Sequence, residues 1–389
     1  MNCCRSSLYC IVPPYLLREI IENGTPEQRQ QALRNIVSAE AVRVQREVIA
    51  KEGPPDPLLE AAPGGGLNRI IYTAENGSSL PGRQLRGEGG APTGDPAADE
   101  AYDGAGATYA LFREVFERDS IDGAGMTLDS TVHYRTGYDN AFWNGRQMVY
   151  GDGDEDLPES QRIFNRFTIA VDIIGHELTH GVTQHTANLI YQGQSGALNE
   201  SMSDVFGSLV KQRLLGQSAA EADWIIGEGL FTSNVNGIGI RSMKEPGTAY
   251  NDPVLGKDPQ PGHMRNYVQT QSDNGGVHIN SGIPNRAFYV TAMNLGGYAW
   301  EKAGLIWYVT LKDKLGESAT FAMAAAKTYE AARDLYGQGS LEQQAVRAGW
   351  AEVGIDVGQD TPPPPDGGGS RPGCSGSLMS LFRSILGPR

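Results

Sequence analysis

The chain of 389 residues contains little cysteine and no long hydrophobic run. Its four cysteines are Cys3, Cys4, Cys10 and Cys374, so residues 11–373 cannot be cross-linked internally, which excludes a disulfide-stabilised main body. No stretch approaches the ~20 apolar residues that a membrane-spanning helix requires, which predicts a soluble protein. The main body must therefore be stabilised by packing, with bound metal ions as a further source.

Positive charge is also scarce. The chain has 46 acidic and 32 basic side chains, a net charge of -14. This excess repels nucleic acid phosphates and argues against nucleic acid as a partner. It leaves two interpretations open, a well-solvated surface or calcium sites.

A secretory signal peptide is the third absence. The apolar patch at residues 8–12 is short, ends at Pro13 and Pro14, and is followed by charged Arg18 and Glu19. We therefore expect secretion by a non-classical route, with a cytoplasmic location as the alternative.

Proline- and glycine-rich segments divide the chain into pieces. Apolar residues at spacings of three and four predict helix over residues 15–51, and Gly53, Pro54, Pro55 and Pro57 end it. The expected pieces are a front segment at 1–52, a linker at 53–67 and two lobes at 68–170 and 171–356, followed by a Pro/Gly linker and tail at 357–389. Apolar residues within 377–386 suit either a frayed tail or a docking helix.

The two lobes differ in their predicted secondary structure. Strand patterns occur at 69–73, 131–134 and 147–150, with one helix near 104–119. Helical patterns follow at 165–185, 197–215, 280–294, 299–314, 317–335 and 340–351. The sequence therefore predicts an α+β fold with a strand-rich lobe followed by a helical one.

The strongest chemical signal is the run His176-Glu177-Leu178-Thr179-His180. Histidines at i and i+4 share one helical face and can both reach a single Zn²⁺ at ~2.0 to 2.1 Å, while Glu177 lies beside them for a metal-bound water. The alternative is a pair of hydrogen-bonded core histidines.

A third ligand is expected from the next helix. Catalytic zinc takes three protein ligands and one open position, and Glu200 follows His180 by twenty residues. Asp204, one turn further, can accept the ring N–H of a ligating histidine. The alternative, an exposed acidic face, is weakened by Met202 and Val205 on the same turns, because buried carboxylates need partners.

Three further blocks are Gly-Tyr-Asp-Asn-Ala-Phe-Trp-Asn-Gly at 137–145, Met-Val-Tyr-Gly-Asp-Gly-Asp at 148–154 and Asp-Asn-Gly-Gly-Val-His-Ile-Asn-Ser-Gly at 273–282. With the zinc helices, they make residues 68–354 resemble the thermolysin-like neutral metallopeptidases. The resemblance implies a two-lobed zinc endopeptidase with its active-site cleft between the lobes. Glu177 would take a proton from the water and pass it to the leaving amine.

The resemblance also implies roles for residues outside the zinc helices. Tyr191 and His278 would stabilise the oxyanion, and Asp273 would orient His278. Substrate backbone would be bound by Asn140, the Ala141 carbonyl and Arg241. The pocket for the residue after the cut would be lined by Phe164, Phe167, Ile173 and Ile240. An apolar pocket rewards burial of a Leu or Phe side chain by about 1.5 to 3 kcal/mol, so cleavage before bulky apolar residues is expected.

The sequence departs from the family at the double calcium site. That site maps to Asp172, Lys211, Asp223 and Glu228, and Lys211 stands where a bridging carboxylate is expected. We hypothesise that its ammonium group replaces the calcium pair, the alternative being an exposed surface lysine. Calcium elsewhere stays open, with the acidic loop at Asp152, Asp154, Glu155 and Asp156 as the place to look.

The front segment, with Pro13-Pro14-Tyr15-Leu16, resembles the short propeptide of the protealysin-type branch. We expect it to fold against the catalytic lobe, block the cleft and be removed by the enzyme itself within about 50–67. The Cys10 thiolate is a candidate zinc cap, against an incidental cysteine.

Two other functional readings remain beside that of an active endopeptidase. One is an intracellular peptidase with a narrow protein target, which the lack of a signal sequence leaves open. The other is an inactive relative kept as a scaffold, which loss of Glu177 or His278 would have signalled. Expected partners are protein and peptide substrates and the chain's own propeptide, and a monomer is expected.

Overall fold

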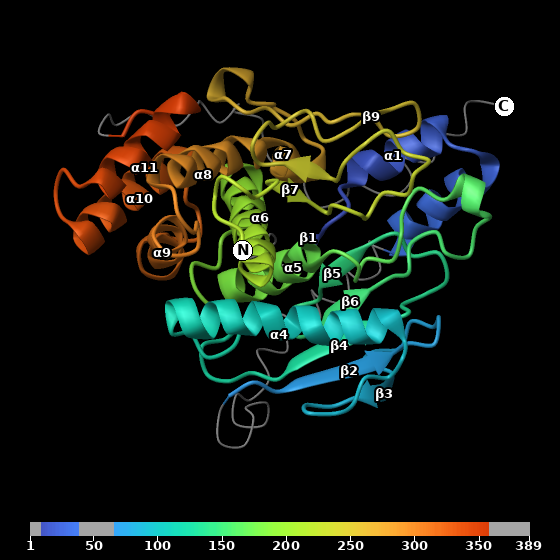
Figure 1. Cartoon of the computed structure of the whole chain (residues 1–389). Helices are drawn as coiled ribbons and strands as arrows, with labels where there is room; N and C mark the ends of the chain where they lie inside the picture. Colours follow the sequence, from blue (N-terminus) through green and yellow to red (C-terminus); the bar gives the residue numbers. More distant parts are fainter. Residues whose placement is uncertain (1–8, 39–65, 358–389) are drawn as a thin grey trace, which may run out of the picture.

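The strand-rich lobe is built on a six-stranded mixed sheet (Figure 1). The structure is a computed structural model that describes residues 9–38 and 66–357. The strand order is β1-β5-β6-β4-β2-β3. The central strands β2, β4 and β6 run parallel, and the remaining pairs are antiparallel. The strands are β1 (Tyr9–Cys10), β2 (Arg69–Thr73), β3 (Arg83–Arg86), β4 (Leu128–Val132), β5 (Ala141–Trp143) and β6 (Met148–Tyr150).

A long helix, α4 (Pro96–Phe116), joins the sheet to the helical core. Asp95 caps its start by accepting a hydrogen bond from the Ala97 amide, and Pro96 suits a first helical position that needs no N–H donor. Small buried residues such as Ala98 and Ala101 let α4 pack between strands β2 and β4 on one side and helices α5 and α6 on the other (Figure 1).

The helical lobe surrounds α6 (Gly193–Leu215), whose central turns are buried on all sides. Helices α5, α7, α8 and α9 contact it. The other helices are α5 (Val171–Gln184), α7 (Asp273–Asn280), α8 (Gly282–Leu295), α9 (Ala303–Val309), the π-helical η3 (Thr310–Lys314), α10 (Phe321–Tyr336) and α11 (Leu341–Glu352). The short elements of the fold are η1 (Glu159–Gln161), η2 (Met264–Asn266), β7 (Ile225–Ile226), β8 (Arg241–Ser242), β9 (Asn251–Asp252) and β10 (Gly256–Lys257).

Helices α5 and α6 approach so closely that glycine is required between them. A Cβ on Gly207 would lie 2.4 Å from the Asp172 carbonyl oxygen, and one on Gly175 would lie 3.0 Å from the Gly207 Cα. These two helices carry the predicted zinc ligands, so the glycines set the distance across which those ligands meet.

The front segment forms two helices where the sequence predicted one. Helix α1 (Pro14–Asn23) ends at Gly24, and helix resumes over residues 26–38. The single-helix prediction was wrong because Pro26 has no N–H to continue α1, while the Thr25 hydroxyl accepts from the Gln28 amide and starts a new helix. The rest of the predicted helix, most of the 53–67 linker and the tail lie outside the described residues.

Several predicted boundaries were also displaced. The strand at 69–73 is confirmed, but the helix expected at 104–119 begins at Pro96, because its cap at Asp95 was not recognised. The helix predicted at 299–314 is α9 followed by the π-helical turn η3, because the spacing of apolar residues does not distinguish a short π-helical turn from the end of an α-helix. Short strands β1, β3 and β5 were missed, since two to four residues give too little alternation to detect.

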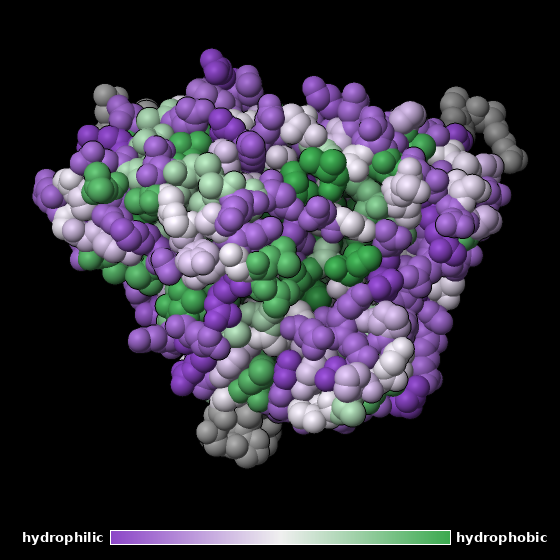
Figure 2. Space-filling model, in the orientation of Figure 1, coloured by the Kyte–Doolittle hydropathy of each residue, from purple (hydrophilic) through white to green (hydrophobic). Residues whose placement is uncertain are grey.

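Figure 2 shows a mainly hydrophilic face with a hydrophobic area near its centre. Among residues 9–38 and 66–357, no helix combines the length and apolar character needed to cross a bilayer.

Candidate active site

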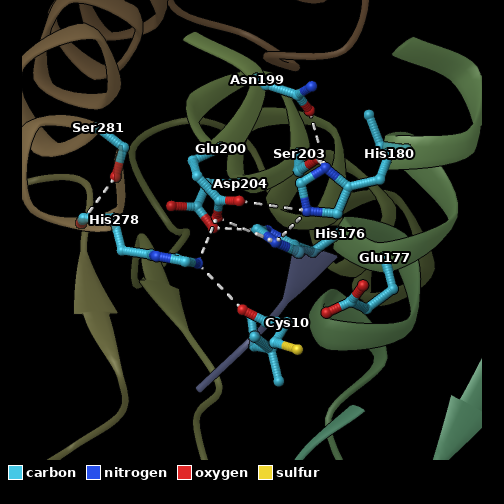
Figure 3. A network of polar contacts seen from close by, with 12 residues as sticks. Cys10, His176, Glu177, His180, Asn199, Glu200, Ser203, Asp204, His278 and Ser281 are labelled. Atoms are coloured by element: carbon cyan, nitrogen blue, oxygen red, sulfur yellow. Dashed lines mark hydrogen bonds and ion pairs between the residues drawn. The ribbon is translucent and has the colours of Figure 1, made fainter. Parts of the chain in front are cut away.

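His176, His180 and Glu200 converge on one point between α5 and α6 (Figure 3). The two Nε2 atoms lie 3.1 Å apart, and each lies 3.5 Å from a different Glu200 carboxylate oxygen. All three side chains are fully buried. Zinc bonds of 2.0 to 2.1 Å in tetrahedral geometry require ligand atoms ~3.4 Å apart, so the three donors fit this metal.

The outer ring nitrogens of both histidines already have partners. His176 Nδ1 lies 2.8 Å from Asp204 Oδ1, and His180 Nδ1 lies 2.8 Å from Asn199 Oδ1. With Nδ1 as the donor in each ring, both Nε2 lone pairs face each other and the Glu200 carboxylate. Three buried acceptors that face one another favour a bound cation over the alternative of two hydrogen-bonded core histidines.

Glu177 lies beside the metal ligands without joining them (Figure 3). One of its carboxylate oxygens, Oε2, accepts a hydrogen bond of 3.0 Å from the backbone N–H of Trp143 in β5. The side chain is fully buried. This contact orients the carboxylate between the zinc ligands and strand β5.

His278 is held by Asp273 at the start of α7. Asp273 Oδ1 lies 2.6 Å from the ring Nδ1, and its Oδ2 accepts from the His278 amide at 2.9 Å. Burial alone would lower the pKa of His278, but the carboxylates of Asp273 and Glu200 outweigh it and raise the pKa to about 9. Because Nδ1 faces Asp273 Oδ1, a protonated ring can donate from Nε2.

Tyr191 completes this side of the site. Its hydroxyl donates to Glu200 Oε1 and lies 3.1 Å from His278 Nε2. Burial and the Glu200 carboxylate raise the pKa of Tyr191 well above its ordinary value, so the hydroxyl keeps its proton and remains a donor.

The front segment runs through the site as an added strand. Tyr9 and Cys10 pair antiparallel with Trp143 and Phe142 at the edge of the sheet. The Cys10 carbonyl oxygen lies 3.1 Å from His278 Nε2, and the Ile11 amide donates to the Ala141 carbonyl at 3.3 Å (Figure 3). This segment therefore forms the main-chain contacts expected of an extended peptide substrate.

The next residues of the segment meet the other predicted substrate contacts. Arg241 Nη1 donates to the Ile11 carbonyl at 3.2 Å, and the Val12 amide donates to Asn140 Oδ1 at 3.0 Å. Asn140, Ala141 and Arg241 thus all bind the same short stretch of backbone.

Arg241 and the zinc ligand His176 share one buried carboxylate. Asp204 accepts two hydrogen bonds of 2.8 Å from Arg241, and Asn285 donates to its Oδ2 at 2.8 Å. Burial would raise the pKa of Asp204, but Arg241 and His176 outweigh it and hold the pKa below its ordinary range. The carboxylate therefore stays ionised and links the metal site to the arginine that binds the front segment.

The four predicted pocket residues are all fully buried in one hydrophobic cluster, which also contains Ile11 of the front segment. The rings of Phe164 and Phe167 lie 5.8 Å apart, and Ile173 and Ile240 both border the space above Gly227. Ile173 of α5 and Ile240, which precedes β8, therefore meet at the apolar side of the site.

Lys211 lies among the three predicted carboxylates. Its Nζ is 2.5 Å from Asp223 Oδ2, 2.8 Å from Glu228 Oε2 and 3.9 Å from Asp172 Oδ2. The lysine side chain is 10% exposed, so it is not an ordinary surface lysine. Burial raises the pKa of Asp172 to about 6, although the Lys211 charge opposes this shift.

The acidic loop has protein partners for three of its carboxylates. Asp152 pairs with His133 at 2.8 Å, Asp154 accepts the Ile163 and Phe164 amides, and Glu155 lies 3.7 Å from Arg166. Within the described part of the chain, the only grouping of His, Cys, Asp and Glu suited to a metal is His176, His180 and Glu200.

Three site features were not anticipated from the sequence. Asn199 and Ser203 both contact His180 Nδ1, at 2.8 and 3.0 Å, and Cys10 contributes its carbonyl where a thiolate had been considered. The metal-binding group does not include the Cys10 thiol. Polar residues spaced four apart on a helix buried on all sides were the available signal for Asn199 and Ser203.

A strand-rich lobe and a helical lobe around a His-Glu-x-x-His helix, with a third carboxylate ligand, define a metalloendopeptidase. Comparison with known families agrees. Residues 71–184 match the thermolysin metallopeptidase catalytic domain, and residues 187–355 match the thermolysin metallopeptidase alpha-helical domain. Residues 9–36 match the protealysin propeptide. The chain belongs to the thermolysin family of zinc metallopeptidases, as its resemblance predicted.

Similar proteins cover nearly the whole chain. An extracellular metalloprotease of Pectobacterium carotovorum subsp. carotovorum is 51% identical over 351 residues, which are 90% of this chain and 97% of the relative. Protease PrtS of Photorhabdus sp. is 48% identical over 353 residues, 90% of this chain and 93% of the relative. The solved precursor of protealysin, a metalloproteinase from Serratia proteamaculans, superposes with a TM-score of 0.80 at 52% identity, covering 89% of this chain and 99% of that one. The predicted fold class and enzyme class are confirmed.

Proposed function

We propose that the protein is a neutral endopeptidase that cuts peptide bonds on the N-terminal side of bulky apolar residues. The observation that carries this proposal is the Cys10 carbonyl, which lies against His278 close to Glu177 and the zinc ligands. A peptide carbonyl in that position is where nucleophilic attack would occur.

Glu177 is assigned the proton transfers. Zinc held by His176, His180 and Glu200 would supply Lewis acidity and lower the pKa of a bound water toward ~7. The Glu177 carboxylate would accept the proton that the water loses on attack and deliver it to the leaving amine nitrogen. Its hydrogen bond from the Trp143 amide supports this role, because it aims the carboxylate at the strand along which the substrate pairs.

His278 and Tyr191 are assigned the stabilisation of the oxyanion. The attacked carbonyl oxygen gains negative charge, and His278 Nε2 is already a donor to the Cys10 carbonyl. Removing one such donor from comparable sites costs about 2.7 to 4 kcal/mol of transition-state stabilisation. Asp273 would act through His278, by fixing the ring and keeping it protonated.

Substrate binding is assigned to the residues that now hold the front segment. Asn140, Ala141 and Arg241 would bind backbone, and Phe164, Phe167, Ile173 and Ile240 would accept an apolar side chain after the cut. Ile11 is fully buried in the same hydrophobic core as these four residues and follows the carbonyl that occupies the reactive position, which supports the preference.

We also propose that residues 1–52 are an inhibitory propeptide, removed by the enzyme itself within about 50–67. The strand formed by Tyr9 and Cys10 supports inhibition, since it occupies the contacts that a substrate needs. The extracellular relative supports secretion. Lys211 is proposed to replace the calcium pair, supported by its position among three carboxylates.

An inactive scaffold is disfavoured, because Glu177 and His278 are both present and oriented toward the site. No specific observation favours a narrow intracellular target.

The test compares purified protein with its Glu177→Gln variant on casein, with and without a zinc chelator, and determines each new N-terminus by mass spectrometry. Expected results are casein cleavage that the chelator abolishes, trimming within about 50–67, and a variant that stays full length. Casein hydrolysis by pure Glu177→Gln protein would refute the catalytic assignment, and spontaneous trimming of that variant would refute self-processing.

A further inference from the structure

Two buried carboxyl groups of the strand-rich lobe lie beneath the second helix of the front segment. Asp139 precedes β5, Asp154 follows β6, and they are 3% and 2% exposed. Neither belongs to the metal-ligand group described above. Their position at the interface with residues 26–38 connects them with the docking of that segment.

Two neutral amides of the segment hold the carboxyl pair. Gln31 Nε2 bridges it, at 2.7 Å from Asp154 Oδ1 and 3.2 Å from Asp139 Oδ1. Asn35 Nδ2 donates to Asp139 Oδ2 at 2.8 Å, and the Asp139 amide donates back to Asn35 Oδ1 at 3.3 Å. Gln31 and Asn35, four residues apart, therefore both form hydrogen bonds to the pair from one helical face.

No basic side chain neutralises this pair. Within the described ranges, neither Asp139 nor Asp154 forms an ion pair with lysine, arginine or histidine, whereas Lys211 supplies a permanent cation to the acidic cluster beside α6. Glutamine and asparagine donate hydrogen bonds but supply no charge. Two buried carboxyl groups that face each other are therefore more stable when one of them is protonated.

The charged groups around the pair do not neutralise it. Asp156 on the same loop adds negative charge. Asp152 and Glu155 are directed to His133 and Arg166, and Arg162 donates to backbone carbonyls. On the helix side, Arg34 is exposed and lines, together with Arg135, a cavity of about 270 Å³ next to Asn35.

The direction of the proton linkage follows from burial. Burial and then the neighbouring Asp154 carboxyl raise the pKa of Asp139 well above its usual range, and burial likewise raises the pKa of Asp154. When the helix leaves, water reaches both groups and reduces burial, the largest cause of both shifts, so both pKa values fall toward the ordinary carboxyl range. This fall opposes the loss of the Gln31 hydrogen bond, which by itself lowers the pKa of Asp139 in the docked state. The docked state thus holds more protons than the released state.

We propose that the Asp139–Asp154 pair, gripped by Gln31 and Asn35, is a proton-dependent latch for the front segment. The proposal rests on the inhibitory role assigned to that segment above. The stabilisation of docking is fully present below the ordinary carboxyl pKa and is lost as the pH rises through the raised values. For each proton released, docking weakens by up to about tenfold per pH unit in that window. The latch holds in acid and loosens as the medium becomes neutral to alkaline.

The test is hydrogen–deuterium exchange of full-length Glu177→Gln protein from pH 5.5 to 8, followed for the amides of residues 26–38. Rates are divided by the intrinsic exchange rate at each pH, and α11 serves as an internal reference for global opening. The corrected exchange of 26–38 should rise by up to about tenfold per pH unit while that of α11 stays constant. The measurement needs no proteolysis, so its outcome is independent of whether the chain cleaves casein.

Two variants in the Glu177→Gln background separate the pair from general surface charge. Asp139→Asn imitates the neutral acid and should flatten the pH dependence. Asp156→Asn makes the same change of charge at an exposed position and should keep the slope, with the pH window moved to lower pH because Asp156 raises both pKa values. A flat profile in the parent overturns the latch without any variant, and so does an unchanged slope in Asp139→Asn.

Discussion

The Arg241 guanidinium holds the Asp204 carboxylate through two hydrogen bonds of 2.8 Å, and both side chains are fully buried. The same carboxylate lies 2.8 Å from the ring of His176. One ionised group therefore orients His176 and also Arg241, the proposed substrate contact. Breaking such a buried pair leaves an uncompensated charge, so substitutions here should have large effects.

Asp204→Asn should weaken zinc binding by about 10- to 100-fold, because an amide no longer offers the His176 ring an anionic acceptor. The measurement is competition with a zinc chelator, using full-length Glu177→Gln protein so that the chain stays intact.

Asp273→Asn is the matched control, since Asp273 stands behind His278, which is not a zinc ligand. It should leave zinc affinity within about twofold and, in otherwise native protein, lower kcat by roughly 100-fold or more through the loss of a protonated donor. Equal changes of zinc affinity in both variants would contradict the separate roles of the two carboxylates.

The zinc site was predictable because each of its constraints is local. His176 and His180 lie one turn apart on one helix, and Glu200 and Asp204 lie one turn apart on the next, so helical periodicity places each pair on one face. The roles of Tyr191, His278 and Arg241 came from resemblance, because their sequence spacing says nothing about their distance in the fold.

The contacts between the front segment and the lobes could not be predicted from the sequence. The bond between Cys10 and His278 joins residues 268 positions apart, and that between Gln31 and Asp154 joins residues 123 apart. Such pairings depend on the docking of a whole segment. Patterns within single helices and strands contain no information about it.

Lys211→Met should lower the free energy of unfolding by about 2 to 4 kcal/mol, because it leaves the buried Asp172 without its nearest cation. Chemical denaturation of the Glu177→Gln protein measures the change. Lys312→Met is the control, since Lys312 is 47% exposed and, among the described residues, pairs only with the neighbouring Asp313, where a surface ion pair contributes at most about 1 kcal/mol.

The response of Tm to calcium should distinguish the protein with Lys211 from a variant with an acidic side chain at this position. The parent Tm should not respond to low millimolar Ca²⁺, whereas Lys211→Glu restores a carboxylate among Asp172, Asp223 and Glu228 and should gain a calcium-dependent rise in Tm. A large rise in the parent, abolished by Asp223→Asn, would reject the proposal that Lys211 replaces the ions.

Gly207→Ala tests whether the close approach of α5 and α6 sets the metal site. The added Cβ would lie 2.4 Å from the Asp172 carbonyl oxygen and 3.0 Å from the His176 amide nitrogen, and both are backbone atoms that cannot rotate away. The helices must separate, so overpacking should cost about 1 to 3 kcal/mol and exceed the ~1 kcal/mol by which alanine normally favours a helix. Zinc affinity should fall as well, because His176 moves away from Glu200.

The control is Gly316→Ala, where no atom lies within 4 Å of the added Cβ and stability should change by about 0.5 kcal/mol or less. Denaturation and chelator competition measure both effects, and a Gly207→Ala protein as stable and as zinc-avid as the Gly316→Ala protein would show that this contact does not position the ligands.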